Sequence, residues 1–182
     1  MLKFDLQLFA DAVLETVQGS DIVYMYRLLE KASSQAAKGL AFTTENEESM
    51  SADSDTTETK DGLVAKAGSV SIEITASSIL SKGDTLIDDL TSALKNRKKV
   101  ELWKINMKEP EPLGAGKKYK ATYYHAYLTE KTETSASDDL AQLELTFQVE
   151  GKGADGYATV TAEQKALIEY AFQDTTAQAA AK

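Results

Sequence analysis

Residues 142–149 read QLELTFQV, and this stretch decides the class of fold. Its apolar side chains, Leu143, Leu145, Phe147 and Val149, alternate with polar ones. An alternation with a period of two indicates a β-strand that buries one face and exposes the other. The sequence therefore predicts a fold that contains half-buried β-strands.

Strand signals recur on both sides of this segment. Val70, Ile72 and Ile74 alternate with polar residues in the same way over residues 70–75. Further strands are expected at residues 21–29, 40–44, 100–107, 119–130 and 157–160. In the third of these, the apolar phase slips between Leu102 and Trp103, which indicates a bulge or burial on both faces. The glycine-rich residues 151–156 are expected to form the turn before the last strand.

One helix is expected over residues 85–96. Asp84 stands where a helix N-cap is needed, and an apolar stripe follows it at helical spacing. A second, short helix is predicted to begin at Thr161 and Gln164, whose spacing is that of a capping box, and to carry Phe172. No strand–helix–strand alternation accompanies these two segments.

The predicted fold is mainly β: an antiparallel β-sandwich or barrel with a flanking α-helix and a long polar loop. The 182 residues are enough for one domain with arms. We divide the chain into an N-terminal arm at 1–19, a β-domain at 20–172 that includes the polar loop 45–62, and a C-terminal tail at 173–182.

The polar loop has the composition of a segment that cannot fold by burial. Residues 45–61 carry a single cation, Lys60. The acids of this segment are Glu45, Glu47, Glu48, Asp53, Asp55, Glu58 and Asp61. Such a run buries too little apolar surface to order itself. Long polar loops inside compact domains are functional or disordered, and the plainest interpretation is a solvated charge run.

Composition argues against several classes of function. The chain has no cysteine, which excludes disulfides, thiolate nucleophiles and cysteine-based zinc sites. The formal net charge of −9 argues against nucleic-acid binding, because phosphate contacts need clustered Lys and Arg. No apolar run approaches the ~20 residues of a membrane helix, and the N-terminus does not resemble a signal peptide.

Some motifs suggest a binding or catalytic site, but the residues around them do not support it. The glycine pattern at 151–156 matches a dinucleotide fingerprint, but a strand-like run follows it where a helix is required. Asp53 and Asp55 begin a calcium-loop pattern that Glu58 and Val64 break at its sixth and twelfth positions. His125 is the only histidine and is expected to pack or pair within its aromatic strand. We expect no enzyme activity, no cofactor and no metal.

The polar segment and its flanks resemble the major tail proteins of long-tailed phages of Gram-positive bacteria. The resemblance rests on the spacing and residue types of Ser49, Ser51, Asp53, Asp55, Thr57, Thr59, Lys60, Asp61 and Gly62 after Leu40, Ala41, Phe42, Thr44 and Glu45. Gly19, Asp21, Ile22, Tyr26 and Arg27 precede the segment, and Thr161, Glu163, Gln164, Tyr170, Phe172, Asp174, Thr175 and Thr176 close it. The similarity spans about residues 19–176.

This resemblance implies a structural virion protein. Members form hexameric rings that stack into the tail tube, the conduit for DNA ejection, and DNA passes through without specific binding. The resemblance also implies contacts with the tape measure, terminator and distal tail proteins, assembly in the virion, and synthesis in the host cytoplasm without a membrane. The alternative is an acidic β-sandwich binding module for a carbohydrate, a cation or a protein, which would stay monomeric as its concentration rises.

Three sets of residues are expected to serve assembly. The seven acids of the polar loop are the predicted contact between successive rings, because the resemblance places the family's stacking loop there. The predicted partner is the densest basic cluster, Lys95, Arg97, Lys98 and Lys99. Glu73 and Glu144, on polar faces of alternating strands, are the candidates for the lumen wall.

Overall fold

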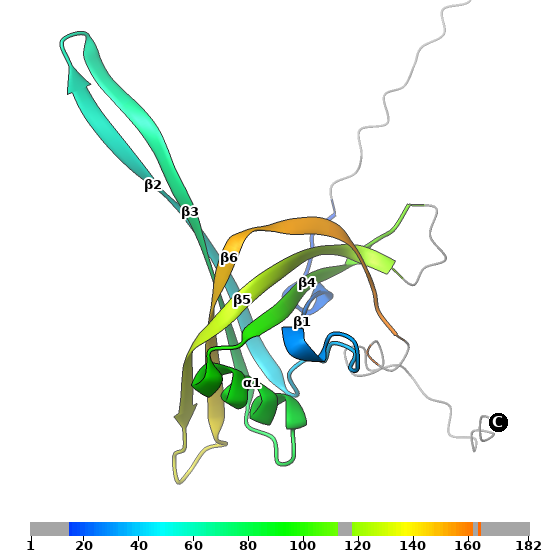
Figure 1. The fold of residues 1–182 in the computed structure, drawn as a ribbon. Coiled ribbons are helices and arrows are strands. Elements are labelled where there is room, and N and C mark those ends of the chain that lie inside the picture. The colour runs from blue at the N-terminus through cyan, green and yellow to red at the C-terminus, as the bar shows by residue number, and fades with distance from the viewer. Residues whose placement is uncertain (1–14, 113–117, 162–163, 165–182) are drawn as a thin grey trace, which may run out of the picture.

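The computed structural model describes residues 15–112, 118–161 and 164 (Figure 1). In chain order the elements are η1 (Gly19–Asp21), β1 (Ile22–Leu28), η2 (Leu29–Lys31), β2 (Thr43–Thr59), β3 (Gly62–Ile79), α1 (Thr85–Asn96), β4 (Lys99–Pro110), β5 (Lys118–Thr134) and β6 (Gln142–Thr159). Residues 1–14 of the N-terminal arm, the body of the helix predicted after Gln164 and the C-terminal tail lie outside the described residues.

The six strands form one antiparallel sheet in the order β1-β4-β5-β6-β3-β2. The sheet curls so that its two edge strands face each other. Tyr26 of β1 stacks on Phe147 of β6 with ring centroids 5.2 Å apart, and its hydroxyl donates a hydrogen bond of 3.4 Å to Asn46 Oδ1 of β2. The predicted mainly antiparallel β fold is confirmed, and its sandwich-like closure comes from a single curled sheet.

The core fills the concave side of this sheet. Ile72, Ile74 and Phe147 are fully buried there, together with Leu90 of α1. The side chains of β6 alternate between buried and exposed from residue 142 to residue 149, as the pattern of the sequence predicts. The burial of one face per strand therefore follows directly from the period-two patterning.

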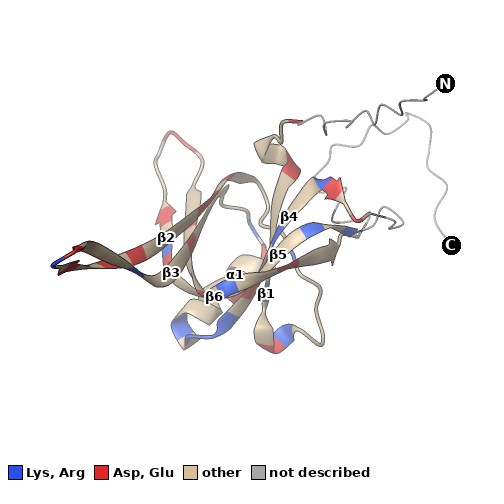
Figure 2. Cartoon of the chain, turned by 90° about the horizontal axis from the view of Figure 1, so that it is seen from above, with Lys and Arg blue, Asp and Glu red and all other residues tan. Residues whose placement is uncertain are grey.

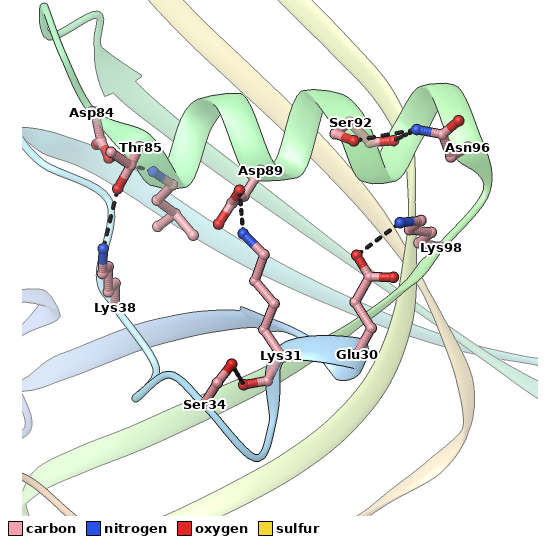
Figure 3. A network of polar contacts seen from close by, with 11 residues as sticks. Glu30, Lys31, Ser34, Lys38, Asp84, Thr85, Asp89, Ser92, Asn96 and Lys98 are labelled. Atoms are coloured by element: carbon pink, nitrogen blue, oxygen red, sulfur yellow. Dashed lines mark hydrogen bonds and ion pairs between the residues drawn. The ribbon is translucent and has the colours of Figure 1, made fainter.

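The helix α1 covers one end of the concave side and has the predicted bounds. Asp84 is its N-cap and accepts a hydrogen bond of 2.9 Å from the Leu86 N–H. Polar contacts join the helix to the segment after β1 (Figure 3): Lys31 Nζ lies 2.6 Å from Asp89, and Lys38 Nζ donates to Thr85 Oγ1 at 3.1 Å. These contacts fix the helix against the β1 edge of the sheet.

A smaller apolar cluster lies on the convex side. It contains Met25, Ile105, Tyr119, Ala121 and Val160, with Trp103 packed against it. Leu102 is buried on the opposite, concave side. The phase slip between residues 102 and 103 therefore marks burial on both faces, one of the two predicted alternatives, and the register of β4 runs unbroken through it.

The prediction of an irregular polar loop at 45–62 is wrong. Residues 43–59 form β2, Lys60 and Asp61 make the turn, and β3 begins at Gly62. The strand is stabilised by its backbone pairing with β3 from Thr43 to Thr59, which requires no burial of side chains. The low burial of this segment did not prevent its ordering, because its Ser and Thr residues favour an extended backbone that pairs with a neighbour.

The predicted turn at residues 151–156 is also wrong. β6 continues through this segment to Thr159, and the pairing with β5 skips between Tyr123 and His125. Residues 151–153 consequently face Tyr124 alone, which makes a β-bulge, and Gly151 and Gly153 take φ angles of 79° and 74°. The glycines supply the left-handed conformations of a bulge rather than those of a hairpin turn.

Candidate functional site

The hairpin formed by β2 and β3 extends far beyond the rest of the sheet (Figure 1). β3 pairs with β6 only from Glu73 to Ile79, so residues 52–70, here called the arm, pair only with each other. Every residue from 51 to 69 is exposed. A two-stranded ribbon of this length buries little surface by itself.

The arm has two chemically different faces. Cross-strand partners share a face, and successive residues alternate between faces. One face continues the core side of the sheet outward from Met50: β3 contributes Val70, Ala67, Ala65 and Leu63 to it, and β2 contributes Ala52, Ser54, Thr56 and Glu58. The opposite face carries Asp53, Asp55, Thr57, Val64 and Lys66. The arm is therefore amphipathic mainly through β3, and its core-side face is here called the apolar face.

A β-bulge keeps the apolar face continuous. The register between β2 and β3 shifts between Ala52 and Ser54, so that Gly68 and Ser69 together face Asp53. Without this extra residue, the side chains of the distal part of β3 would change face. Gly68 suits the bulge because a Cβ there would lie 2.8 Å from the Asp53 carbonyl oxygen.

The arm bears a small negative charge. Its acids are Asp53, Asp55, Glu58 and Asp61, and its cations are Lys60 and Lys66, which gives a formal charge of −4 + 2 = −2. Figure 2 shows acidic positions along its length. Asp55 and Lys66 are cross-strand partners, so on the acidic face part of the charge is offset within the arm.

Glu48 differs from the other predicted contact acids, because its carboxylate points into the subunit. It accepts hydrogen bonds from the Tyr124 hydroxyl at 3.0 Å and the Tyr24 hydroxyl at 3.5 Å, and it pairs with Lys104 Nζ at 2.5 Å. Its side chain is 13% exposed. Burial, with the Glu48 charge adding to it, raises the pKa of Tyr124 to about 12, so the hydroxyl remains a donor at neutral pH.

These contacts join β2 to β1, β4 and β5 at the root of the arm. Glu48 is thus a closing contact of the curled sheet, and its predicted role in the contact between rings stays a prediction. Nothing in the local sequence separates it from Glu45 and Glu47. One feature of the sequence distinguishes it: Glu48 lies two residues before Met50 and four before Ala52, so in a strand the three side chains share a face.

We expect Glu48→Gln to lower the free energy of unfolding by about 2 kcal/mol, because three donors lose a charged acceptor in a mostly buried site. Urea unfolding at pH 7 measures the loss. Glu47→Gln, at an exposed neighbouring position, is the matched control and should change stability by less than about 0.5 kcal/mol. Equal stabilities of the two variants would contradict the role of Glu48.

The two lumen candidates share the convex face of the sheet. Glu73 lies opposite Gln148 in the pairing of β3 with β6, and Glu144 lies opposite Ser77 in the same pairing. Both acids are exposed, and the residues on either side of each are buried on the concave side. The structure therefore places both carboxylates on one polar surface that faces away from the core.

Toward β1, the same convex face carries a polar cluster that the sequence did not indicate. Glu101 is 5% exposed and accepts from Arg27 Nε at 2.7 Å and from the Tyr123 hydroxyl at 2.6 Å. His125 Nε2 lies 2.7 Å from the same hydroxyl, which confirms that the histidine pairs within its aromatic strand. The Arg27 guanidinium also lies 5.1 Å from the centre of the Trp103 ring.

The four cations of the predicted basic cluster divide into two pairs. Lys98 Nζ lies 2.7 Å from Glu30 (Figure 3), and Lys99 Nζ lies 2.5 Å from Glu150. Lys95 and Arg97 form no ion pair with any residue that the structure describes. Only these two remain available as cations for another molecule.

Comparison with known proteins identifies the family. The model of the phage tail tube protein family matches residues 16–155. The chain belongs to this family. A relative from Staphylococcus phage phiMR25, named "Putative tail protein", is 30% identical over 154 residues, which are 82% of this chain and 79% of the relative. The predicted membership of the tail tube proteins is confirmed, and the protein is a structural component of the phage tail and of the virion.

Solved structures share the fold. The SPP1 tail tube protein superposes with a TM-score of 0.69 at 18% identity, covering 90% of this chain and 96% of that one. A protein from the tail of an empty gene transfer agent particle, refined with C6 symmetry, gives 0.56 at 14% identity, covering 80% of this chain and all of that one. The tube-terminating cap protein of the anti-feeding prophage gives 0.53 at 14% identity, covering 86% and 100%.

Residues 15–112, 118–161 and 164 contain neither a candidate membrane helix nor a candidate metal site. No helix in this part of the tail tube protein is long and apolar enough to cross a membrane. The same residues contain no group of three or more His, Asp or Glu placed to hold a metal ion.

Proposed function

We propose that this tail tube protein forms hexameric rings that stack into a hollow tube through which DNA passes. The observation that carries the proposal is the arm: an exposed, amphipathic ribbon that leads away from the body of the subunit (Figure 1). The C6 symmetry of the gene transfer agent tail supports the choice of six subunits, because that protein has the same fold.

The ring contact uses the two edges of the curled sheet. β1 and β2 are the edge strands, and the outer edge of β1 bears a single bridge, from Tyr26 to Lys38. An exposed edge strand pairs readily with another chain. When edge β1 of one subunit meets edge β2 of the next, the contact is heterologous and closes as a ring.

The convex face lines the lumen in this arrangement, with Glu73 and Glu144 as exposed acids on it. Six subunits with a formal charge of −9 each would carry −54. A lumen of the same sign as DNA repels the duplex and keeps it from binding, and salt confines the repulsion to the ~8 Å next to the wall.

The arm forms the contact between successive rings, where it meets the basic cluster. The charge of the arm and the two cations without ion pairs, Lys95 and Arg97, support this pairing. Tape measure, terminator and distal tail proteins would complete the tail. Synthesis takes place in the host cytoplasm.

Assembly of the purified chain tests this function. We expect mass photometry to show rings that grow with concentration, and negative-stain microscopy to show tubes with a central channel. Assembly should weaken as salt rises from about 50 to about 500 mM, because the charges at the arm contact are screened. A chain that gives only monomers or two-fold dimers at every concentration would contradict the proposal.

A further inference from the structure

The apolar face of the arm is an exposed continuation of the core. Met50 is 60% exposed and Leu63 is 71% exposed, and Ala52, Ala65 and Ala67 lie between them on the same face, together with the polar Ser54 and Thr56. A row of apolar side chains that extends from the body into solvent marks a contact with another protein surface. Glu58 is the cross-strand partner of Leu63, so one carboxylate accompanies the apolar row at its distal end.

A groove that could accept the apolar face of the arm and its carboxylate lies where α1 ends. It has a volume of about 540 Å³ and is lined by Leu94, Arg97, Tyr127, Leu128 and Thr129. Leu94 and Leu128 provide apolar walls, and Tyr127 is 36% exposed. The groove therefore offers apolar contact and one cation, which are the counterparts of Leu63 and Glu58.

Arg97 occupies a position that suits glycine better than arginine. It is the C-cap of α1, with φ 53° and ψ 42°, and its N–H donates to the carbonyls of Ala93 and Leu94. A left-handed conformation costs a residue with a Cβ about 1 kcal/mol, and glycine is the usual choice there. The C-cap thus holds the Arg97 backbone at a fixed point beside the groove, and the Arg97 guanidinium forms no ion pair with any residue that the structure describes.

The occupant of the groove is a second copy of the chain. The arm of the same subunit points away from α1 (Figure 1), so it cannot reach its own groove. A contact between two different surfaces of identical chains is heterologous and continues into an open polymer, as a stack of rings requires.

Charge favours this groove over a second hollow of the subunit. That hollow, of about 310 Å³, lies near the C-terminal end of β3 and includes Asp139 and Glu144 in its lining. These carboxylates would repel Glu58 and Asp61 of an incoming arm. Arg97 in the groove attracts them.

We propose that the apolar face of the arm of one subunit packs into the groove at the end of α1 in a subunit of the next ring, where Glu58 pairs with Arg97. This contact rests on the proposed tube function and names the two surfaces that meet. Apolar packing gives the contact its strength, and the charge pair sets the register of the arm.

Disulfide cross-linking tests the geometry, because the chain has no cysteine of its own. Thr56→Cys and Thr129→Cys proteins are mixed in equal amounts under assembly conditions and oxidised, which leaves Glu58 and Arg97 in place. We expect a cross-linked heterodimer that neither variant forms alone. Thr57→Cys is the matched control, because its side chain lies on the opposite face of the arm from that of residue 56. Equal cross-linking from residues 56 and 57 would overturn the proposed face.

Arg97→Gly separates assembly from folding. The glycine suits the left-handed C-cap, so thermal stability should be unchanged or higher, while the concentration needed for tubes should rise about tenfold. Lys82→Gly removes the same charge at an exposed loop position and should assemble normally. Glu58→Arg together with Arg97→Glu should restore assembly that each change weakens.

The outcomes distinguish this contact from the tube function itself. Tubes formed by Arg97→Gly at the wild-type concentration would overturn the groove contact and leave the tube function standing. A wild-type chain that forms no ring or tube at any concentration would overturn both.

Discussion

A chain that lacks residues 54–67 is expected to fold normally and to lose tube formation. The deletion joins Asp53 to Gly68 and keeps the pair formed by Ala52 and Val70. Asp-Gly-Ser then connects the strands, and a three-residue connection that contains glycine is a favourable hairpin loop. The removed residues are all exposed, so the free energy of unfolding should change by less than about 1 kcal/mol.

The loss of tubes follows from the loss of the proposed contact between rings. Rings should still form, because β1 and the proximal part of β2 remain as edges. Urea unfolding checks the fold, mass photometry counts the subunits in each ring, and negative-stain microscopy scores the tubes. Long tubes from the shortened chain would contradict the stacking role of the arm.

The limits of this deletion are set by the root of the arm. A cut that began at residue 46 would also remove Asn46 and Glu48. These residues hold Tyr26, Tyr24, Tyr124 and Lys104 across the concave side. Loss of tubes after the larger cut would then report a damaged fold and say nothing about stacking.

The elements that bury one face could be predicted from the sequence. The strand pattern at 142–149 and the capped helix at 85–96 both appear where predicted, because burial imposes a regular spacing on apolar residues. The extent of β2 and β3 could not be predicted this way. Between the pair formed by Ala52 and Val70 and the tip of the hairpin, neither strand pairs with the rest of the sheet. Only the pairing of β2 with β3 therefore determines how far the two strands extend.

The candidate site was only partly visible in the sequence for a related reason. Glu48 and Glu47 are neighbours of the same type, yet only Glu48 meets Lys104, Tyr24 and Tyr124, which are 56, 24 and 76 residues away in the chain. The ion pairs of the basic cluster are equally hard to predict, because their partners are distant in the sequence: Lys98 pairs with Glu30, 68 residues away. Local patterns cannot contain such information.

Gly153 shows how a local pattern can indicate the wrong element. Its φ of 74° is compatible with a turn, but the residue lies in the bulge of β6 directly beneath Tyr124. A Cβ at this position would lie 2.3 Å from Tyr124 Cε1 and 2.6 Å from Cδ1. The need for glycine comes from a ring that is distant in sequence, and this need has a measurable consequence.

We expect Gly153→Ala to lower the free energy of unfolding by about 3 kcal/mol, the sum of a left-handed backbone penalty and the displacement of a packed ring. Gly151→Ala separates the two causes, because its φ is 79° but open space surrounds its Cβ position, so it should cost about 1 kcal/mol. Gly156→Ala has neither problem and should be neutral. Urea unfolding of the three variants measures the three changes in the free energy of unfolding. If Gly153→Ala costs no more than Gly151→Ala, the Tyr124 ring does not constrain the bulge.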